Sequence, residues 1–419
     1  MKKIITLLVL SANFAFSQET TISLDSCIAQ ARRNYPLIQQ NNLLSESERN
    51  NIRGINENWY PKLTFSANAA YQTEVIQFNL PGFNVQIPHD TYMSTLALDQ
   101  TLYDGGQTRS QKRIESLNTV TETLKNEVEM YKVVDRVSNL YSNILLTREN
   151  LQVLKTYKND IENKQKNLSA SVQNGLALQS SIDELDAESL KTEQSIIETQ
   201  ENLSALYKTL SLYINQPLSD AVVLTTIPVG GIMKRTEVNR PELKMLSAQK
   251  ELLDARYNMI NKMALPRISI TAAANYGRPG PNFINQELRF FGNAALNVRW
   301  NINSLYGLSR EKSKLSVNQR MLDVQTEVFN FHLAATLNTQ TAQINSLQEM
   351  ITRDKQIVEK RHNVTVTASK QLENGSITTS DYLLQLNAEM QATLNQKIHE
   401  IRLMSAISNY NTTQGINNF

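Results

Sequence analysis

Four short segments of the chain alternate apolar and polar residues, the pattern of a β-strand with one apolar face. The first runs from Leu63 to Tyr71, and the second carries Leu96, Leu98 and Leu102 on one face. The other two strands are predicted from later alternating sets: Ile268, Ile270, Ala272, Ala274 and Tyr276, then Ala294, Leu296, Val298, Trp300 and Ile302. Loops containing Gly and Pro, at 80–89 and 277–292, separate the strands within each pair.

Long helices are predicted after each strand pair. No Gly or Pro occurs from about Thr108 to Val172 or from Leu308 to Asn374. Apolar residues recur there at steps of three and four, as in coiled coils. Each stretch would make a helix about 100 Å long. Glycines at 175 and 375 then permit tight reversals into return helices at about 177–213 and 377–413.

A shorter helical region precedes the first strand pair. It runs from about Leu24 to Asn58, and we expect Ser23 or Asp25 to cap it. Pro36 is expected to divide it, and Pro61 is expected to stop it.

The second half of the chain repeats the motifs of the first. Asn34-Tyr35-Pro36-Leu37 is echoed at Pro241, Tyr60-Pro61-Lys62-Leu63 at Pro266, and Asn174-Gly175 at Asn374-Gly375. A repeat of about 200 residues indicates a duplicated domain. We therefore expect a signal peptide at 1–17, a first repeat at 18–215, a linker at 216–235 and a second repeat at 236–419. The linker region from Pro217 to Gly231 shows no helical period and is predicted to be irregular.

The first residues have the pattern of an export signal. Lys2 and Lys3 precede an apolar stretch from Ile4 to Phe16, and Ala15 and Ser17 suit a small-residue cleavage site. The apolar stretch is too short to span a bilayer, which needs about 20 residues. Cys27 lies too far beyond it for a lipoprotein anchor and is better explained as a small buried residue.

Composition excludes several classes of protein. The 42 Lys and Arg against 40 Asp and Glu leave no basic excess for nucleic-acid binding, and one Cys excludes a disulfide framework. The 13 Gly and 10 Pro are few for 419 residues, while Asn and Gln number about 74. This composition favours long helices with an uncharged polar surface.

The strands set the strongest constraint on fold. Transmembrane barrels start at about eight strands, so four cannot close one. An open sheet cannot lie in lipid, because its edge N–H and C=O groups would be unpaired. Either helices cover a soluble sheet, or several chains share one barrel. Export and the very long helices favour the shared barrel, with polar side chains facing a water-filled lumen.

The order and spacing of the motifs resemble those of TolC-family outer-membrane factors, the outer membrane efflux proteins. The resemblance covers nearly the whole mature chain. It rests on the two proline elements, on Tyr60-Pro61-Lys62-Leu63, on the segment from Gln100 to Gly106 that enters the long helix, and on both glycine turns. It implies a mainly α fold with a small β part, built from duplicated helix-strand-strand-long helix-helix halves. The implied assembly is a homotrimer, whose transmembrane β-barrel takes four strands per chain and continues into a periplasmic α-helical barrel.

The resemblance also implies a function and partners. It implies an outer-membrane exit channel of a tripartite efflux or type I secretion system, extending into the periplasm. A periplasmic adaptor (membrane fusion protein), an inner-membrane transporter of the RND or ABC type and outer-membrane lipid would be its partners, and nucleic acid would not.

Two groups of site residues follow from the resemblance. The helix turns that match the adaptor-contacting tips are Gly175, Leu176 and Ala177, and Gly375, Ser376 and Ile377. Asp381 lies where the family can place an acidic periplasmic constriction, which would attract cations. The corresponding position of the first half is Ser181, with Asp183 two residues later. Asp381 is equally explained as a helix N-terminal carboxylate, and the glycines as C-capping residues.

No enzymatic pattern is present in the sequence. The histidines at 89, 332, 362 and 399 are scattered, and no phosphate loop, nucleophile elbow or dinucleotide fingerprint occurs. We therefore expect neither catalysis nor a cofactor or metal. The alternative to a channel is an exported coiled-coil envelope protein, such as a spacer or adhesin.

Overall fold

The structure is a computed structural model that describes residues 21–80, 83–86, 88–175, 177–219, 222–226, 238–282 and 287–415. The predicted signal peptide, Leu176 and parts of the predicted linker lie outside these residues. The chain divides into two compact units, and each draws on both halves of the sequence. Unit 1 comprises residues 1–38, 128–240 and 330–419, and unit 2 comprises 39–127 and 241–329.

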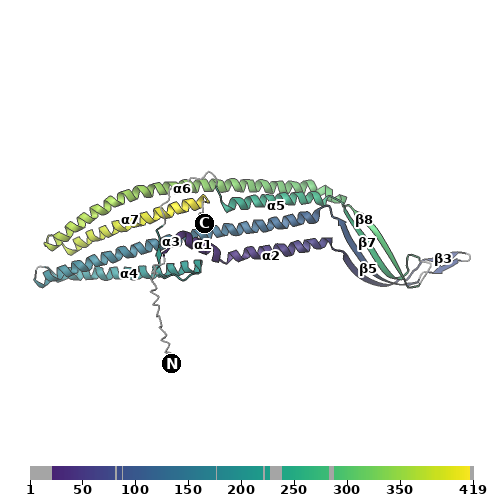
Figure 1. The fold of residues 1–419 in the computed structure, drawn as a ribbon, viewed down its shortest axis with the longest axis horizontal. Helices are drawn as coiled ribbons and strands as arrows, with labels where there is room; N and C mark the ends of the chain where they lie inside the picture. The colour runs from purple at the N-terminus through teal and green to yellow at the C-terminus, as the bar shows by residue number, and fades with distance from the viewer. Residues whose placement is uncertain are drawn as a thin grey trace, which may run out of the picture. The chain divides into compact units, whose positions relative to one another are not determined.

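Unit 2 contains the predicted strands as one antiparallel sheet. Its strands are β2 (Lys62–Tyr71), β5 (Asp90–Tyr103), β7 (Arg267–Arg278) and β8 (Arg289–Arg299), in the order β2-β5-β7-β8 (Figure 1). The central pair joins one strand from each half of the sequence, and β2 and β8 are the edges. The fourth strand was predicted to extend to Ile302, but it ends at Arg299 and a 3₁₀ turn, η2 (Ile302–Ser304), follows. Asn and Ser around Ile302 favour such a turn over a strand.

The strand register separates the side chains onto two faces. Leu63 lies opposite Leu98, Leu98 opposite Ala272, and Ala272 opposite Ala294. Residues paired in this way share a face. We call this the apolar face; it carries Leu63, Phe65, Tyr71, Tyr92, Leu96, Leu98, Ile270, Tyr276, Phe290, Leu296 and Val298. The opposite, polar face carries Thr64, Ser66, Asn68, Thr95, Ala97, Ser269, Thr271, Asn275, Asn293, Ala295 and Asn297.

The predicted loop at 80–89 contains secondary structure that the sequence reasoning missed. Two short strands, β3 (Gln77–Leu80) and β4 (Phe83–Gln86), pair with each other in antiparallel register. Each has four residues, which is too short for alternation to stand out beside the Pro-Gly turn signal.

The helices of unit 2 contact one another through polar side chains. They are α2 (Leu37–Asn56), α5 (Pro241–Met263) and the N-terminal parts of α3 (Gln107–Gln173) and α6 (Leu305–Glu373). Asn51 donates to Glu115 at 2.6 Å, and Asn126 donates to Asn41 at 2.9 Å, joining α2 to α3. Asn side chains therefore join α2 to α3, although no residue of α2 is buried.

A tight turn at Asp104-Gly105-Gly106 joins β5 to α3. The Asp104 carboxylate accepts from the N–H of Gly106 at 2.8 Å and from the N–H of Thr108 at 2.7 Å. Gly105 has φ of 71°, and a Cβ there would lie 2.9 Å from the Cβ of Leu265. Carboxylate and glycine together set the direction in which the long helix leaves the sheet.

Unit 1 is built from paired helices. It contains α1 (Leu24–Asn34), α4 (Gln179–Ile214) and α7 (Thr379–Thr413), with the C-terminal parts of α3 and α6. In Figure 1, α4 runs beside α3 and α7 beside α6. Ser23 caps α1 by accepting from the N–H of Ser26, and the break around Pro36 separates α1 from α2, both as predicted.

The main core of unit 1 gathers around α3. Val137, Tyr141 and Ile144, which the three-four pattern predicts to be apolar contacts, are fully buried with Cys27 and Leu210. The linker region from Pro217 to Gly231, predicted to be irregular, contains a two-residue strand, β6 (Val223–Leu224). This strand pairs in parallel with β1 (Thr21–Ile22). Such short strands depend on a distant partner, so local sequence does not reveal them.

We predict that Tyr141→Phe destabilises the pairing of β1 with β6. The buried Tyr141 hydroxyl lies 2.8 Å from the carbonyl oxygen of Ile22 and 2.6 Å from that of Thr225. Its loss should cost about 1–2 kcal/mol locally. Amide exchange at residues 21–25 and 222–226 should become faster, as measured by hydrogen–deuterium exchange. Tyr306→Phe, at a side chain that is 81% exposed, is the control. Unchanged exchange in Tyr141→Phe would contradict the assigned role.

Candidate functional site

Large apolar side chains of the sheet are exposed on its apolar face. Phe65 is 71% exposed, Leu296 66% and Val298 65%. A surface of this kind on several neighbouring strands marks an interaction site for an apolar partner or for lipid. The face forms part of the candidate site for that reason.

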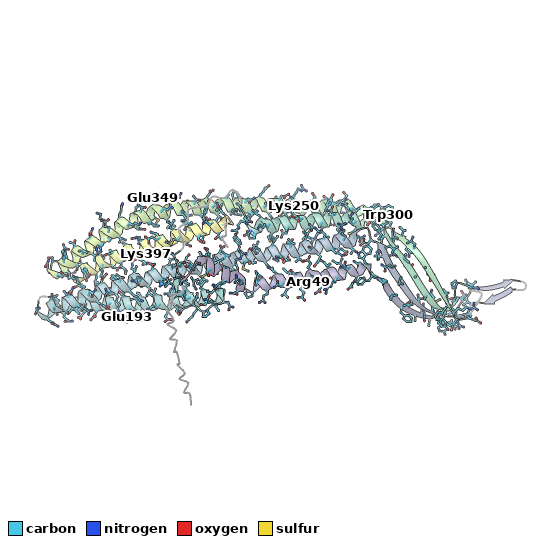
Figure 2. All side chains as sticks on the ribbon, in the orientation of Figure 1. Arg49, Glu193, Lys250, Trp300, Glu349 and Lys397 are labelled. Atoms are coloured by element: carbon cyan, nitrogen blue, oxygen red, sulfur yellow. The ribbon has the colours of Figure 1, made fainter. Side chains whose placement is uncertain are left out.

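Aromatic residues flank this apolar surface at both ends of the strands. At the end where the strands join the helices lie Trp59, Tyr60, Tyr103 and Trp300, and at the far end lie Tyr71, Tyr92, Tyr276 and Phe290. Figure 2 shows Trp300 where β8 gives way to α6, and its indole N–H donates to the carbonyl of Ala264 at 2.9 Å. Tyr276 packs against Phe290 with 4.5 Å between ring centroids.

The spacing of the two aromatic groups has the dimension of a membrane. Phe290 and Trp300 are ten residues apart. At about 3.4 Å per residue and a tilt of about 45°, this spacing corresponds to roughly 24 Å, close to the ~25 Å apolar band of outer-membrane sheets. Aromatic girdles at both interfaces are typical of such proteins.

The polar face is linked by neutral hydrogen bonds. The Thr95 hydroxyl donates to the Asn275 amide oxygen at 2.8 Å, and Asn275 donates to Asn293 at 3.1 Å. Asn297 donates to the Thr271 hydroxyl at 2.9 Å. These groups suit contact with water. The sheet therefore has one face suited to lipid and one suited to water.

Both edges of the sheet are open in the described part of the chain. No strand pairs with the outer side of β2 or β8. Each edge therefore presents a row of backbone N–H and C=O groups that another strand can pair with.

The glycine turns are helix C-caps. Gly175 has φ of 70° and Gly375 has φ of 69°. The Gly375 N–H donates to Leu372 O at 3.0 Å and the Ser376 N–H to Gln371 O at 2.8 Å, a Schellman-type arrangement.

The predicted tip residues divide into exposed and packed positions. Gly175, Gly375 and Ser376 are exposed. Ala177 and Ile377 instead pack against a small buried cluster around Leu185 and Leu372. Leu176 lies outside the described residues. The exposed turn residues are thus accessible to solvent, while the packed ones hold the turns in place.

Asp381 takes part in a capping box at the start of α7. The Asp381 N–H donates to the Thr378 hydroxyl oxygen at 3.1 Å, and the Thr378 N–H donates to the Asp381 carboxylate at 3.1 Å. Hydrogen bonds from the hydroxyl and then from the backbone of Thr378 lower the pKa of Asp381. Asp183 in α4 is exposed and accepts from the Gln179 side chain at 3.1 Å.

A further contact joins the second turn of α4 to the first turn of α7. The Ser380 hydroxyl donates to the carboxylate of Glu184 at 3.1 Å. Glu184 follows Asp183 directly, so three exposed carboxylates, those of Asp183, Glu184 and Asp381, occupy these two helix starts. The sequence reasoning missed Glu184 because the pairing of the two turns is not visible in a linear sequence.

Two histidines bind carboxylates of neighbouring helices. His362 of α6 lies 2.7 Å from Glu389 of α7, and His399 of α7 lies 2.6 Å from Asp354 of α6. In the described part of the chain, no three His, Cys, Asp or Glu side chains gather as a metal site.

None of the helices described is both long and apolar enough to cross a membrane.

Comparisons with known proteins agree with this geometry. Residues 27–216 match the model of the family described as outer membrane efflux protein. These residues belong to the outer membrane efflux protein family. The resemblance predicted from the motifs is thereby confirmed.

Solved structures extend the likeness to nearly the whole chain. CusC, reported for its folding and transmembrane channel formation, matches with a TM-score of 0.72 at 14% identity, over 93% of this chain and 91% of that one. The outer membrane protein VceC of Vibrio cholerae matches with a TM-score of 0.66 at 14% identity, over 93% of this chain and 94% of that one. The CmeC outer membrane channel of Campylobacter jejuni matches with a TM-score of 0.66 at 13% identity, over 94% of this chain and 86% of that one. A search among curated protein sequences found no match.

The mainly α fold with a small β part is confirmed, whereas the trimer and the shared barrel stay predictions. The chain is mainly helical with a small sheet, has the element order expected for the two halves, and shares the fold of these outer-membrane channels. The aromatic girdles were missed, although the sequence contains their signal: aromatic residues recur at the ends of the alternating segments.

We predict that the stability of the capping box at the start of α7 depends on pH. The lowered pKa of Asp381 means that its stabilising contribution is present above about pH 4, the ordinary carboxyl pKa, and is lost as pH falls through the lower folded pKa. Protection of the amides of residues 378–382 should therefore decrease on acidification, measured as exchange protection factors. Asp381→Asn should show weaker protection that changes little over the same range. Equal pH dependence in both proteins would contradict the prediction.

Proposed function

We propose that the protein is the outer-membrane exit channel of a tripartite efflux or type I secretion system. It works as a homotrimer, with the sheet in outer-membrane lipid and the helices extending into the periplasm. A periplasmic adaptor and an inner-membrane transporter of the RND or ABC type deliver cargo, which passes without catalysis. The family match and the fold shared with outer-membrane channels support this proposal.

The sheet is the observation that carries the proposal. Its apolar face, bordered by aromatic residues, fits lipid, and its polar face fits water. Its open edges do not fit lipid, because unpaired backbone groups cost several kcal/mol each there. Pairing the β2 edge of one copy with the β8 edge of the next satisfies both edges and closes a ring.

Three copies are the smallest number that also gives a passage. Two copies of a four-stranded sheet would make eight strands, whose interior side chains fill. Three copies make twelve strands, which leave room for a water-filled lumen. The polar face, with its linked Asn and Thr side chains, would line that lumen.

The helices that flank the sheet edges support the same arrangement. α2 leads into the edge strand β2, and α6 follows the edge strand β8. α6 exposes Val317, Met321, Val324 and Val328, which recur at coiled-coil spacing. α2 has no buried residue, and its Leu43 is 62% exposed. Edge pairing would bring α6 of one copy beside α2 of the next.

The helix turns are the proposed contact with the adaptor. Gly175, Gly375 and Ser376 are exposed at the ends of the two helix pairs. The carboxylates of Asp183, Glu184 and Asp381 lie on the helix starts that follow, and three copies would place them around one opening. This acidic group fits a constriction that favours cations.

Two neighbouring substitutions test the proposed placement of the sheet. Leu296→Lys puts a charge on the apolar face, whereas Ala295→Lys puts it on the polar face. A lysine at the lipid midplane costs about 2–4 kcal/mol, so Leu296→Lys should lower the heat-modifiable oligomer in the membrane fraction several-fold. Ala295→Lys should assemble normally and form channels in planar bilayers.

Two results would contradict the proposal. Equal loss of assembly in both variants would show that the faces are not lipid and water. A wild-type protein recovered as a soluble periplasmic monomer would favour the exported spacer or adhesin instead.

A further inference from the structure

The ionisable residues of the polar face are confined to the ends of the strands. Between residues 64–70, 91–97, 269–277 and 291–297, this face has only Thr, Ser, Asn, Ala, Gly, Met and Phe. At the end where the strands join the helices, it carries Lys62, Asp99, Arg267 and Arg299. A solute moving along the neutral middle would meet its first charges there.

These charges are not balanced within the sheet. Lys62 lies opposite Asp99, so the register places opposite charges side by side. Arg267 lies opposite Arg299, and like charges directly opposite are destabilising. Arg267 donates to the Thr101 hydroxyl, a neutral partner. In the part of the chain that the structure describes, neither arginine forms an ion pair with a carboxylate.

The other arginines of the sheet behave differently. Arg278 pairs with Asp90 across β5 and β7, and Arg289 lies 3.0 Å from Glu287. The exposed pair Arg267 and Arg299 is therefore the one place on the sheet where two positive charges meet without local compensation. Nothing in the fold requires this arrangement, since Ser269 and Asn297 form the next pair of the same register without charge.

Arginine is suited to interact with anions. Its guanidinium stays charged at any physiological pH and presents a planar set of donors that matches carboxylates, sulfates and phosphates. Rings of charged side chains decide which ions enter a channel. Three copies of Arg267 and Arg299 would make such a ring.

We propose that Arg267 and Arg299 form an arginine collar that selects anions, and cargo bearing carboxylate, sulfate or phosphate groups, where the sheet joins the helices. The proposal rests on the proposed function, because the polar face must line an aqueous lumen for the collar to act. It assigns to the collar a preference opposite to that of the acidic helix starts.

Reversal potentials of the purified full-length protein in planar bilayers test the collar. A KCl gradient at about 10–100 mM is used, because the Debye length is then about 10–30 Å and the collar acts across the lumen. Replacing both arginines, Arg267→Gln with Arg299→Gln, should lower the chloride-to-potassium permeability ratio by about two-fold or more, and the difference should vanish at 1 M salt. Asp381→Asn, as an opposite control, should raise the ratio.

A charge-preserving variant separates charge from structure. Arg267→Lys with Arg299→Lys should keep the wild-type ratio. If the lysine variant loses selectivity as the glutamine variant does, or if the glutamine variant forms normal channels with unchanged selectivity, the collar is refuted while the channel stands. If the wild-type protein forms no channels, the proposed function fails first. If the double glutamine variant does not assemble, the single variants are measured, and each must shift the ratio in the same direction.

Discussion

Backbone hydrogen bonding in lipid is the constraint on which the whole structure depends. A sheet of four strands has two edges, and both are open in the part of this chain that the structure describes. The apolar face and aromatic girdles fit lipid, yet lipid offers no partner to edge N–H and C=O groups. In a single copy, the apolar face favours contact with lipid, whereas the unpaired edges oppose it. The proposed association of three copies would resolve that conflict.

The helices of unit 2 also leave apolar surface uncovered in a single copy. In unit 2, polar contacts such as Asn51 with Glu115 join the helices, and large apolar side chains of α6 remain exposed. In unit 1, by contrast, Tyr141 and its neighbours form a conventional buried core. Cys27 belongs to this core, and burial raises its pKa to about 12. The Asn and Gln surplus thus fits helices with large exposed surfaces, such as α2, in which no residue is buried.

How much was predictable from the sequence depended on how local each signal was. Alternation at Leu63–Tyr71 and Ile268–Tyr276 predicted strands correctly, and the absence of Gly and Pro predicted both long helices to within a few residues. The β1–β6 pair and the Ser380–Glu184 contact were missed because each joins segments distant in sequence. The position of Asp381 at a helix N-terminus was predicted as one interpretation, whereas its capping box with Thr378 was not. The acidic constriction and the adaptor contacts involve other molecules and stay predictions.

Cross-linking between copies tests the central claim most directly. One cysteine is placed on β2 at Ser66 and a second at successive positions of β8, and the buried Cys27 stays unreactive. Within a chain, β5 and β7 separate the edges by about 14 Å, too far for a disulfide, which needs Cα atoms within about 7 Å. The account predicts that oxidation in membranes yields covalent trimers at a single register. Monomers at every position, or an open ladder of larger oligomers, would contradict it.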